Sequence, residues 1–181
     1  GIDLMVAMNP QTYRQDVAEV VPGGTLIYDS SWPRDFGRAD IDVVGIPLAQ
    51  LSALASDDLR KRQLFKNVIY LGALSRLIEI DIEVIEALIA EQFKAKPALV
   101  EPNLKALHIG RDYVRDNLAH PLAVRARKAD ATRSKIMITG NEAGALGALY
   151  AGATVASWYP ITPSTSLAEF FEKHANKLRR D

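Results

Sequence analysis

The residues with the most distinctive spacing for chemistry form a loop near the end of the chain, Tyr159-Pro160-Ile161-Thr162-Pro163. Each proline fixes its own backbone and pushes the residue before it, Tyr159 or Thr162, toward an extended conformation. The Thr162 hydroxyl is therefore held in a stiff loop, where it could donate a hydrogen bond to a ligand. It could equally cap the helix that follows, and the residues alone leave both interpretations open.

The elements around this loop predict where its side chains lie. Residues 136–139 and 153–157 have the pattern of β-strands, and residues 142–150 have that of a short helix between them. Such a strand–helix–strand unit should be parallel and right-handed. The loop then sits at the carboxyl end of a parallel strand and before a closing helix over residues 168–180. Ligands of open α/β sheets bind at such places, and a helix N-terminus favours anions.

Two further features of this region have alternative interpretations. Ser166 and Glu169 have capping-box spacing, so they compete with Thr162 as the start of the closing helix. Gly140, Gly144 and Gly147 come close to a glycine-rich phosphate loop. Because the last two fall inside the predicted helix, we favour tight packing of this surface over phosphate binding.

The first two thirds of the chain predict an α/β domain with a helical extension. Strands are expected at residues 2–8, 25–28 and 42–46, with a helix over residues 10–20 that Asn9 and Pro10 begin. Pro22-Gly23-Gly24 predicts a turn, and Asp81 is expected to cap one of the later helices. The predicted organisation is one unit over residues 1–118, a linker over residues 119–134 and a second unit over residues 135–181.

The composition excludes several classes of function. Apolar residues make up 48% and charged residues 24% of the chain, and the net charge is zero. This balance gives no field that would gather nucleic acid or an anionic membrane. The chain has no cysteine, so it can form neither a disulfide nor a thiolate-ligated zinc or iron–sulfur site. No apolar run approaches the length of a membrane span, and the expected compartment is the cytoplasm. Because both ends fall within predicted elements, we expect the sequence to be truncated at both ends.

Several motifs together resemble one enzyme family. Gly140-Asn141-Glu142-Ala143, Gly152-Ala153 and the proline-containing loop through Ser164 resemble the start of the alpha subunit of 2-oxoacid:ferredoxin oxidoreductases, its thiamine-pyrimidine domain. Upstream segments resemble the second half of the gamma domain of the same family, in the order of a fused gamma–alpha subunit. These segments are residues 3–9, 22–24, 28–31 and 103–106, with Gly110.

The resemblance implies oxidative decarboxylation of a 2-oxoacid with coenzyme A to acyl-CoA and carbon dioxide, with electrons passed to ferredoxin. It also implies thiamine diphosphate with Mg2+ shared with a beta subunit that carries a [4Fe-4S] cluster, within a higher hetero-oligomer. Thr162 matches the family threonine that contacts substrate, while Tyr159, Pro160, Ile161 and Pro163 shape the loop. By itself this stretch should bind no cofactor and should be inactive. Fused chains of this kind often use 2-oxoglutarate, which we expect here by analogy.

Two alternatives belong to other classes of protein. The chain could be a non-catalytic α/β scaffold or interaction fragment, with the loop serving only as a structural turn. It could also be a Rossmann-type nucleotide-binding oxidoreductase, although the Gly-x-Gly-x-x-Gly fingerprint is absent from the sequence.

Overall fold

The computed structural model describes residues 1–118 and 122–178, and the chain divides into two compact units. Unit 1 is Gly1–Lys128 and unit 2 is Ala129–Asp181, so the boundary falls within the segment expected to be a linker. His120 and Pro121 of that segment, and the last residues expected in the closing helix, lie outside the described residues. The helices of the described part include none long and apolar enough to cross a membrane.

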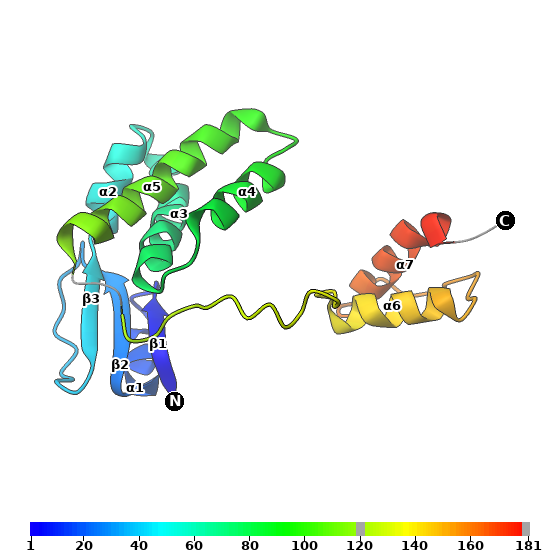
Figure 1. Cartoon of the computed structure of the whole chain (residues 1–181), viewed down its shortest axis with the longest axis horizontal. Helices are drawn as coiled ribbons and strands as arrows, with labels where there is room; N and C mark the ends of the chain where they lie inside the picture. The colour runs from blue at the N-terminus through cyan, green and yellow to red at the C-terminus, as the bar shows by residue number, and fades with distance from the viewer. Residues whose placement is uncertain (119–121, 179–181) are drawn as a thin grey trace. The chain divides into compact units, whose positions relative to one another are not determined.

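Unit 1 is built on a three-stranded parallel sheet in the order β1-β2-β3 (Figure 1). The strands are β1 (Ile2–Ala7), β2 (Val20–Asp29) and β3 (Asp42–Ile46), and α1 (Tyr13–Glu19) connects the first two. Consecutive side chains of a strand point to opposite faces. Accordingly, Leu26 and Tyr28 pack with α1 on one face, whereas Ile27 packs with the later helices on the other.

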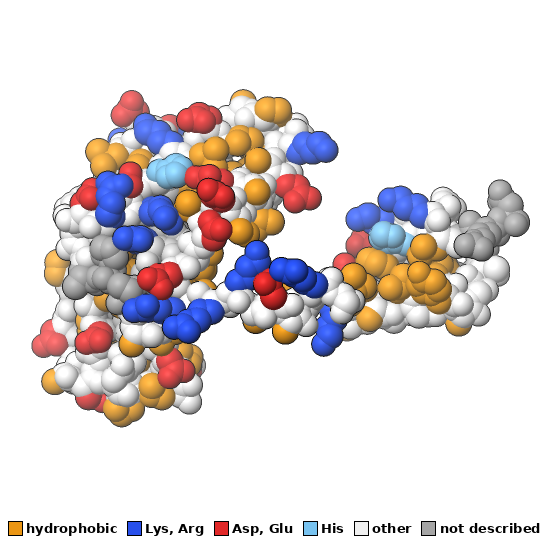
Figure 2. Space-filling view, viewed as in Figure 1, with side chains coloured by type: hydrophobic (Ala, Val, Ile, Leu, Met, Phe, Trp, Pro, Cys, Tyr) orange, Lys and Arg blue, Asp and Glu red, His pale blue; other side chains and the backbone are white. Residues whose placement is uncertain are grey.

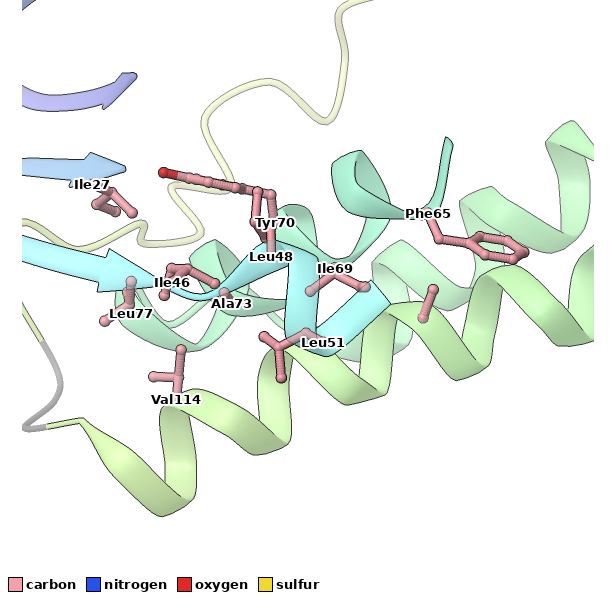
Figure 3. Close-up of a cluster of buried hydrophobic side chains, with 11 residues drawn as sticks. Ile27, Ile46, Leu48, Leu51, Phe65, Ile69, Tyr70, Ala73, Leu77 and Val114 are labelled. Atoms are coloured by element: carbon pink, nitrogen blue, oxygen red, sulfur yellow. The ribbon is translucent and has the colours of Figure 1, made fainter. Parts of the chain in front are cut away.

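Four helices and one 3-10 turn follow the sheet, and three of these helices pack on its second face. They are α2 (Leu48–Ala55), α3 (Leu59–Leu77), α4 (Ile82–Gln92), η1 (Pro97–Leu99) and α5 (Val100–Asn117). Figure 3 shows the core between them, where Ile27, Ile46 and Ile69 are fully buried. Each such side chain contributes about 1.5–3 kcal/mol by leaving water. The predicted α/β class with a helical extension is therefore confirmed.

The contact between α3 and α5 depends on two glycines. A Cβ on Gly72 would collide with the carbonyl oxygen of Leu107, and a Cβ on Gly110 would collide with that of Ile69. The two helix backbones therefore touch directly where these residues face each other. Only glycine permits this approach, so both positions are fixed by packing.

Several local predictions for unit 1 can be compared with the structure. Asp81 caps α4 as expected, because its carboxylate accepts a hydrogen bond from Glu83 N at 3.2 Å. Asn9 accepts from Gln11 N at 3.0 Å, but this forms a turn, and α1 begins only at Tyr13. The turn expected at residues 22–24 is instead an irregularity within β2. Between the pairs Ile2–Val20 and Leu4–Thr25, β1 advances two residues while β2 advances five.

The segment after α5 is attached to unit 1. Leu122 N donates to Leu77 O at 3.0 Å, and Ala126 N donates to Ile78 O at 2.8 Å. Arg125 forms an ion pair with Glu79 at 3.4 Å, and the Leu122 side chain packs on the core. Residues 122–126 therefore lie along the C-terminal end of α3, and this part of the expected linker is bonded to the domain before it.

Unit 2 consists of two packed helices, α6 (Gly140–Tyr150) and α7 (Thr165–Leu178). The strands predicted at residues 136–139 and 153–157 are not formed, so this part of the prediction is wrong. Parallel strands are stable when neighbouring strands bond them and both faces are covered. Within the described residues neither segment forms a strand, and Met137 and Val155 are exposed.

Candidate functional site

The proline loop, residues 159–164, joins the extended segment after α6 to the start of α7 in unit 2. Its prolines are at positions 160 and 163, and the Thr162–Pro163 peptide bond is cis. The loop is exposed: Tyr159 retains 79% of its accessible surface and Ile161 retains 61%. Apolar side chains gather on the visible face of this unit (Figure 2).

Hydrogen bonds within the loop stiffen it beyond the effect of the prolines. The Ser164 hydroxyl donates to Ile161 O at 2.7 Å and lies 3.3 Å from Tyr159 O. Ile161 N donates to Tyr159 O at 2.7 Å, and Ser164 N donates to Ile161 O at 2.9 Å. Ser164 therefore closes the loop on itself. The sequence interpretation did not identify it as a loop-forming residue, although serine is common in turns for this reason.

The loop is also bonded to the first turn of α6. Asn141 Nδ2 donates to Pro163 O at 2.7 Å and to the Ser166 hydroxyl at 2.8 Å. These bonds cross 22 and 25 residues of sequence, which is why local pattern could not reveal them. Asn141 was noted only as part of a family motif, yet it joins the start of α6 to the start of α7.

The structure separates the roles proposed for Thr162. Its side chain is exposed, and its hydroxyl makes no hydrogen bond with any described residue. The helix-cap interpretation of Thr162 is therefore wrong. The Ser166–Glu169 capping box is also wrong, because α7 begins at Thr165 and places Ser166 inside the helix. Leu167 N and Ala168 N instead bond the backbone carbonyl of Ser164. The Thr162 hydroxyl is thus available to a ligand.

A capping box is present at the other helix. Thr139 and Glu142 bond reciprocally: Glu142 N donates to the Thr139 hydroxyl at 3.3 Å, and Thr139 N donates to the Glu142 carboxylate at 3.0 Å. The Thr139 N–H, and the Thr139 hydroxyl at 3.0 Å, donate to the Glu142 carboxylate and lower the pKa of this carboxyl below its ordinary value. The Thr-x-x-Glu spacing of this box is visible in the sequence. The box fixes where α6 begins, one residue before Asn141.

The glycines of α6 do not serve tight packing. A Cβ on Gly144 would lie 3.5 Å from Leu167 of α7, an ordinary contact, whereas one on Gly140 or Gly147 would meet open space. Among the described contacts none of the three is required by a close approach, so the expectation of tight packing is wrong. Gly140 and Gly147 leave the surface of the helix open.

A cavity lies in unit 1, at the carboxyl ends of β1 and β2. It has a volume of about 310 Å3, and its lining includes Asp29, Trp32 and Lys66. Asp29 accepts from Ser31 N and Leu48 N at 3.0 and 3.1 Å, and lies 3.7 Å from Lys66 Nζ. Tyr70 is buried nearby with no hydrogen bond to its hydroxyl among described groups, and burial raises its pKa. Figure 3 shows this hydroxyl directed toward the strand ends.

Metal ligands do not cluster in the described part of the chain. Residues 1–118 and 122–178 contain no group of three or more His, Cys, Asp or Glu side chains placed to hold a metal ion.

Comparisons with known proteins agree with the motifs. The family model for pyruvate ferredoxin/flavodoxin oxidoreductase matches residues 1–113. The 2-oxoacid:ferredoxin oxidoreductase 2 subunit alpha of Aeropyrum pernix is 28% identical over 76% of this chain and 22% of that protein. The 2-oxoglutarate oxidoreductase subunit KorA of Mycobacterium tuberculosis is 28% identical over 96% of this chain and 30% of that protein.

A solved structure shares the fold over the whole chain. The 2-oxoglutarate:ferredoxin oxidoreductase from Magnetococcus marinus, determined with 2-oxoglutarate, coenzyme A and succinyl-CoA bound, matches with a TM-score of 0.83 at 26% identity. The match covers 100% of this chain and 31% of that one, so the chain spans less than a third of the length of these relatives. The family match over most of the chain, together with these relatives, leads to one conclusion: the chain belongs to the pyruvate ferredoxin/flavodoxin oxidoreductase family, as part of a subunit.

Proposed function

We propose that the chain is part of a thiamine-diphosphate-dependent enzyme that oxidatively decarboxylates a 2-oxoacid with coenzyme A. The products are acyl-CoA, carbon dioxide and two electrons for ferredoxin. Unit 1 corresponds to the second half of a gamma domain, and unit 2 to the start of the pyrimidine-binding domain of the alpha subunit. In this assignment the two units are consecutive parts of a fused subunit.

The observation that carries the proposal is the state of Thr162. Its hydroxyl has no hydrogen-bond partner among the described residues, while Ser164 and Asn141 bond the loop around it. A donor held in this way costs little reorganisation when a substrate oxygen gains negative charge. We assign Thr162 to that role, with Tyr159, Pro160, Ile161 and Pro163 shaping the loop beside the thiamine.

The exposure of the loop indicates that other polypeptide completes the site. A hydrogen bond is worth most to a developing charge when water is excluded, and Ile161 and Tyr159 are largely open to solvent. We propose that a beta subunit covers this surface, holds the Mg2+ and diphosphate of the cofactor, and carries the [4Fe-4S] cluster. Thiamine diphosphate supplies the carbanion chemistry, and this chain orients the substrate.

For the substrate we propose 2-oxoglutarate. Two of the three proteins described above are named for it, and the third is named only for a 2-oxoacid. The complete enzyme should therefore reduce ferredoxin and form succinyl-CoA when supplied with 2-oxoglutarate and coenzyme A, and pyruvate should be used less well.

The test is an assay of the complete complex with each 2-oxoacid, with and without thiamine diphosphate and coenzyme A. Ferredoxin reduction that requires both would support the proposal. A complex that reduces no ferredoxin with any 2-oxoacid would favour the scaffold interpretation. Activity that is independent of thiamine diphosphate would contradict the proposed chemistry.

A further inference from the structure

We infer that Asn141 is a positioning residue, which holds the proline loop against α6 and thereby sets the place of Thr162. The inference rests on the proposed function, since it assigns to Asn141 a part in the same site. Asn141 would touch neither substrate nor cofactor. It would act through the loop that carries the threonine.

The geometry identifies the donor group without ambiguity. Asn141 is the second residue of α6, and one polar atom of its side chain lies 2.7 Å from Pro163 O and 2.8 Å from the Ser166 hydroxyl. A carbonyl oxygen can only accept, so the atom facing Pro163 must be the amide NH2. Its two hydrogens match the two acceptors, and one amide therefore bonds the end of the loop and the start of α7 together.

The bonded positions explain why this amide controls Thr162. Pro163 follows Thr162 directly, and the ring of Pro163 fixes its own backbone. The bond from Asn141 to Pro163 O therefore holds the Pro163–Ser164 peptide, one residue beyond the threonine, at a fixed distance from α6. On the other side, Ser164 bonds Ile161 O at 2.7 Å. The loop is rigid in itself, and Asn141 anchors it to a helix whose own start is fixed by the Thr139–Glu142 box.

Asn141→Asp in the complete enzyme separates positioning from general stability. Aspartate has nearly the same shape but cannot donate, and its charge would face the Pro163 carbonyl. An acidic residue in the first turn of a helix is otherwise favourable. A purely structural role predicts that Asn141→Asp shifts the melting temperature by the balance of these effects and leaves kcat/KM of the folded enzyme unchanged. Positioning predicts a loss of kcat/KM in the folded enzyme, whatever the shift in melting temperature.

Two readouts are expected to change. The kcat/KM for 2-oxoacid should fall about 10- to 100-fold, because a displacement of about 1 Å at a reacting centre has effects of that size. Amide hydrogen exchange in a peptide spanning residues 159–166 should become faster. Asn141→Ala removes the donors without adding charge and should act in the same direction. The Ser166 hydroxyl accepts from Asn141 at 2.8 Å and donates to Pro163 O at 3.4 Å. Ser166→Ala removes these two bonds but keeps the bond from Asn141 to Pro163 O, and it should have the smallest effect of the three.

Combination with Thr162→Val tests whether Asn141 acts through the threonine. If it does, the added loss caused by Asn141→Asp should be smaller in the Thr162→Val background than in the wild type. Unchanged exchange and unchanged kcat/KM in both Asn141 variants would overturn the inference. Faster exchange in Asn141→Asp, together with full turnover of Thr162→Val, would support the anchoring of the loop and overturn the proposed role of Thr162. The anchoring role of Asn141 is therefore tested by hydrogen exchange and kcat/KM of the Asn141 variants, and the role of Thr162 by the turnover of Thr162→Val.

Discussion

In unit 1 the sheet buries apolar side chains from both of its faces, whereas in unit 2 the apolar segments on either side of α6 remain open. Ile27, Ile46 and Ile69 are fully buried, while Ile136 and Val155 of unit 2 are 70% and 81% exposed. Both regions have similar strand-like sequences. Strand formation in unit 1 depends on neighbours that the chain itself supplies, and unit 2 lacks such neighbours among its described residues. The proline loop lies in the more open of the two units.

The largest effect is expected from a matched pair of glycine substitutions, which compares the tightly packed helices of unit 1 with the open surface of α6 in unit 2. Gly110→Ala should destabilise unit 1 by about 3 kcal/mol or more, because the new Cβ would force α3 and α5 apart. Gly147→Ala should stabilise α6 by about 0.5–1 kcal/mol, because its Cβ meets open space and alanine favours the helix. Denaturant unfolding of both variants, followed by hydrogen exchange in each unit, measures the two effects.

The outcome of this pair would also show whether the α6 surface is open in the assembled enzyme. If Gly147→Ala is stabilising in the isolated chain but weakens subunit assembly, the open surface of α6 is covered in the complex. Equal losses of stability from both substitutions in the isolated chain would contradict the contrast between the two units.

A smaller effect is expected from the cap that begins α6. Thr139→Ala removes the side-chain acceptor of Glu142 N and should cost about 1 kcal/mol of stability. Because Asn141 follows this cap, the variant should also speed hydrogen exchange in the proline loop. Thermal melting followed by circular dichroism measures the loss of stability, and amide hydrogen exchange at residues 159–166 measures the change in the loop. A Thr139→Ser control, which retains the hydroxyl, should leave both nearly unchanged.

The smallest expected effect is a pH dependence of α6. The pKa of Glu142 is lower in the folded chain than its ordinary value of 4.5. The carboxylate therefore adds stability above that ordinary value, and this stability is lost as pH falls through the lowered pKa. Unfolding measured between about pH 6 and pH 3 should show this loss in the wild type. Glu142→Gln keeps a capping-box side chain without the titrating charge and should flatten that part of the profile. If Glu142→Gln has the same pH dependence of unfolding as the wild type, the Glu142 carboxylate is not the source of the pH-dependent stability.

The features that sequence could predict are those decided by near neighbours. The Asp81 cap depends on residues two positions apart, and the Thr139–Glu142 box was equally visible in the spacing. The α/β class followed from the alternation of elements. The strands at residues 136–139 and 153–157 were predicted wrongly, because a strand-like pattern does not itself provide a bonding partner.

The features that the sequence could not predict depend on contacts between residues far apart in the chain. The requirement for Gly72 exists only because α5 crosses α3 at that point, and Gly110 was noted for its family motif. The bond from Asn141 to Pro163 likewise spans 22 residues and could not be predicted from local pattern. For the candidate site, the sequence predicted the stiff loop and its threonine. The structure excluded the alternative in which Thr162 caps a helix.

The most direct test of the proposed site is the turnover of Thr162→Val in the complete enzyme, measured beside its melting temperature. Valine keeps nearly the same shape and removes the hydroxyl, which makes no hydrogen bond with the described residues. Turnover with 2-oxoacid should fall about a hundred- to a thousandfold, the usual result of removing one donor to a developing charge. The melting temperature and subunit assembly should not change. Full turnover in Thr162→Val would contradict the account and remove Thr162 from the site.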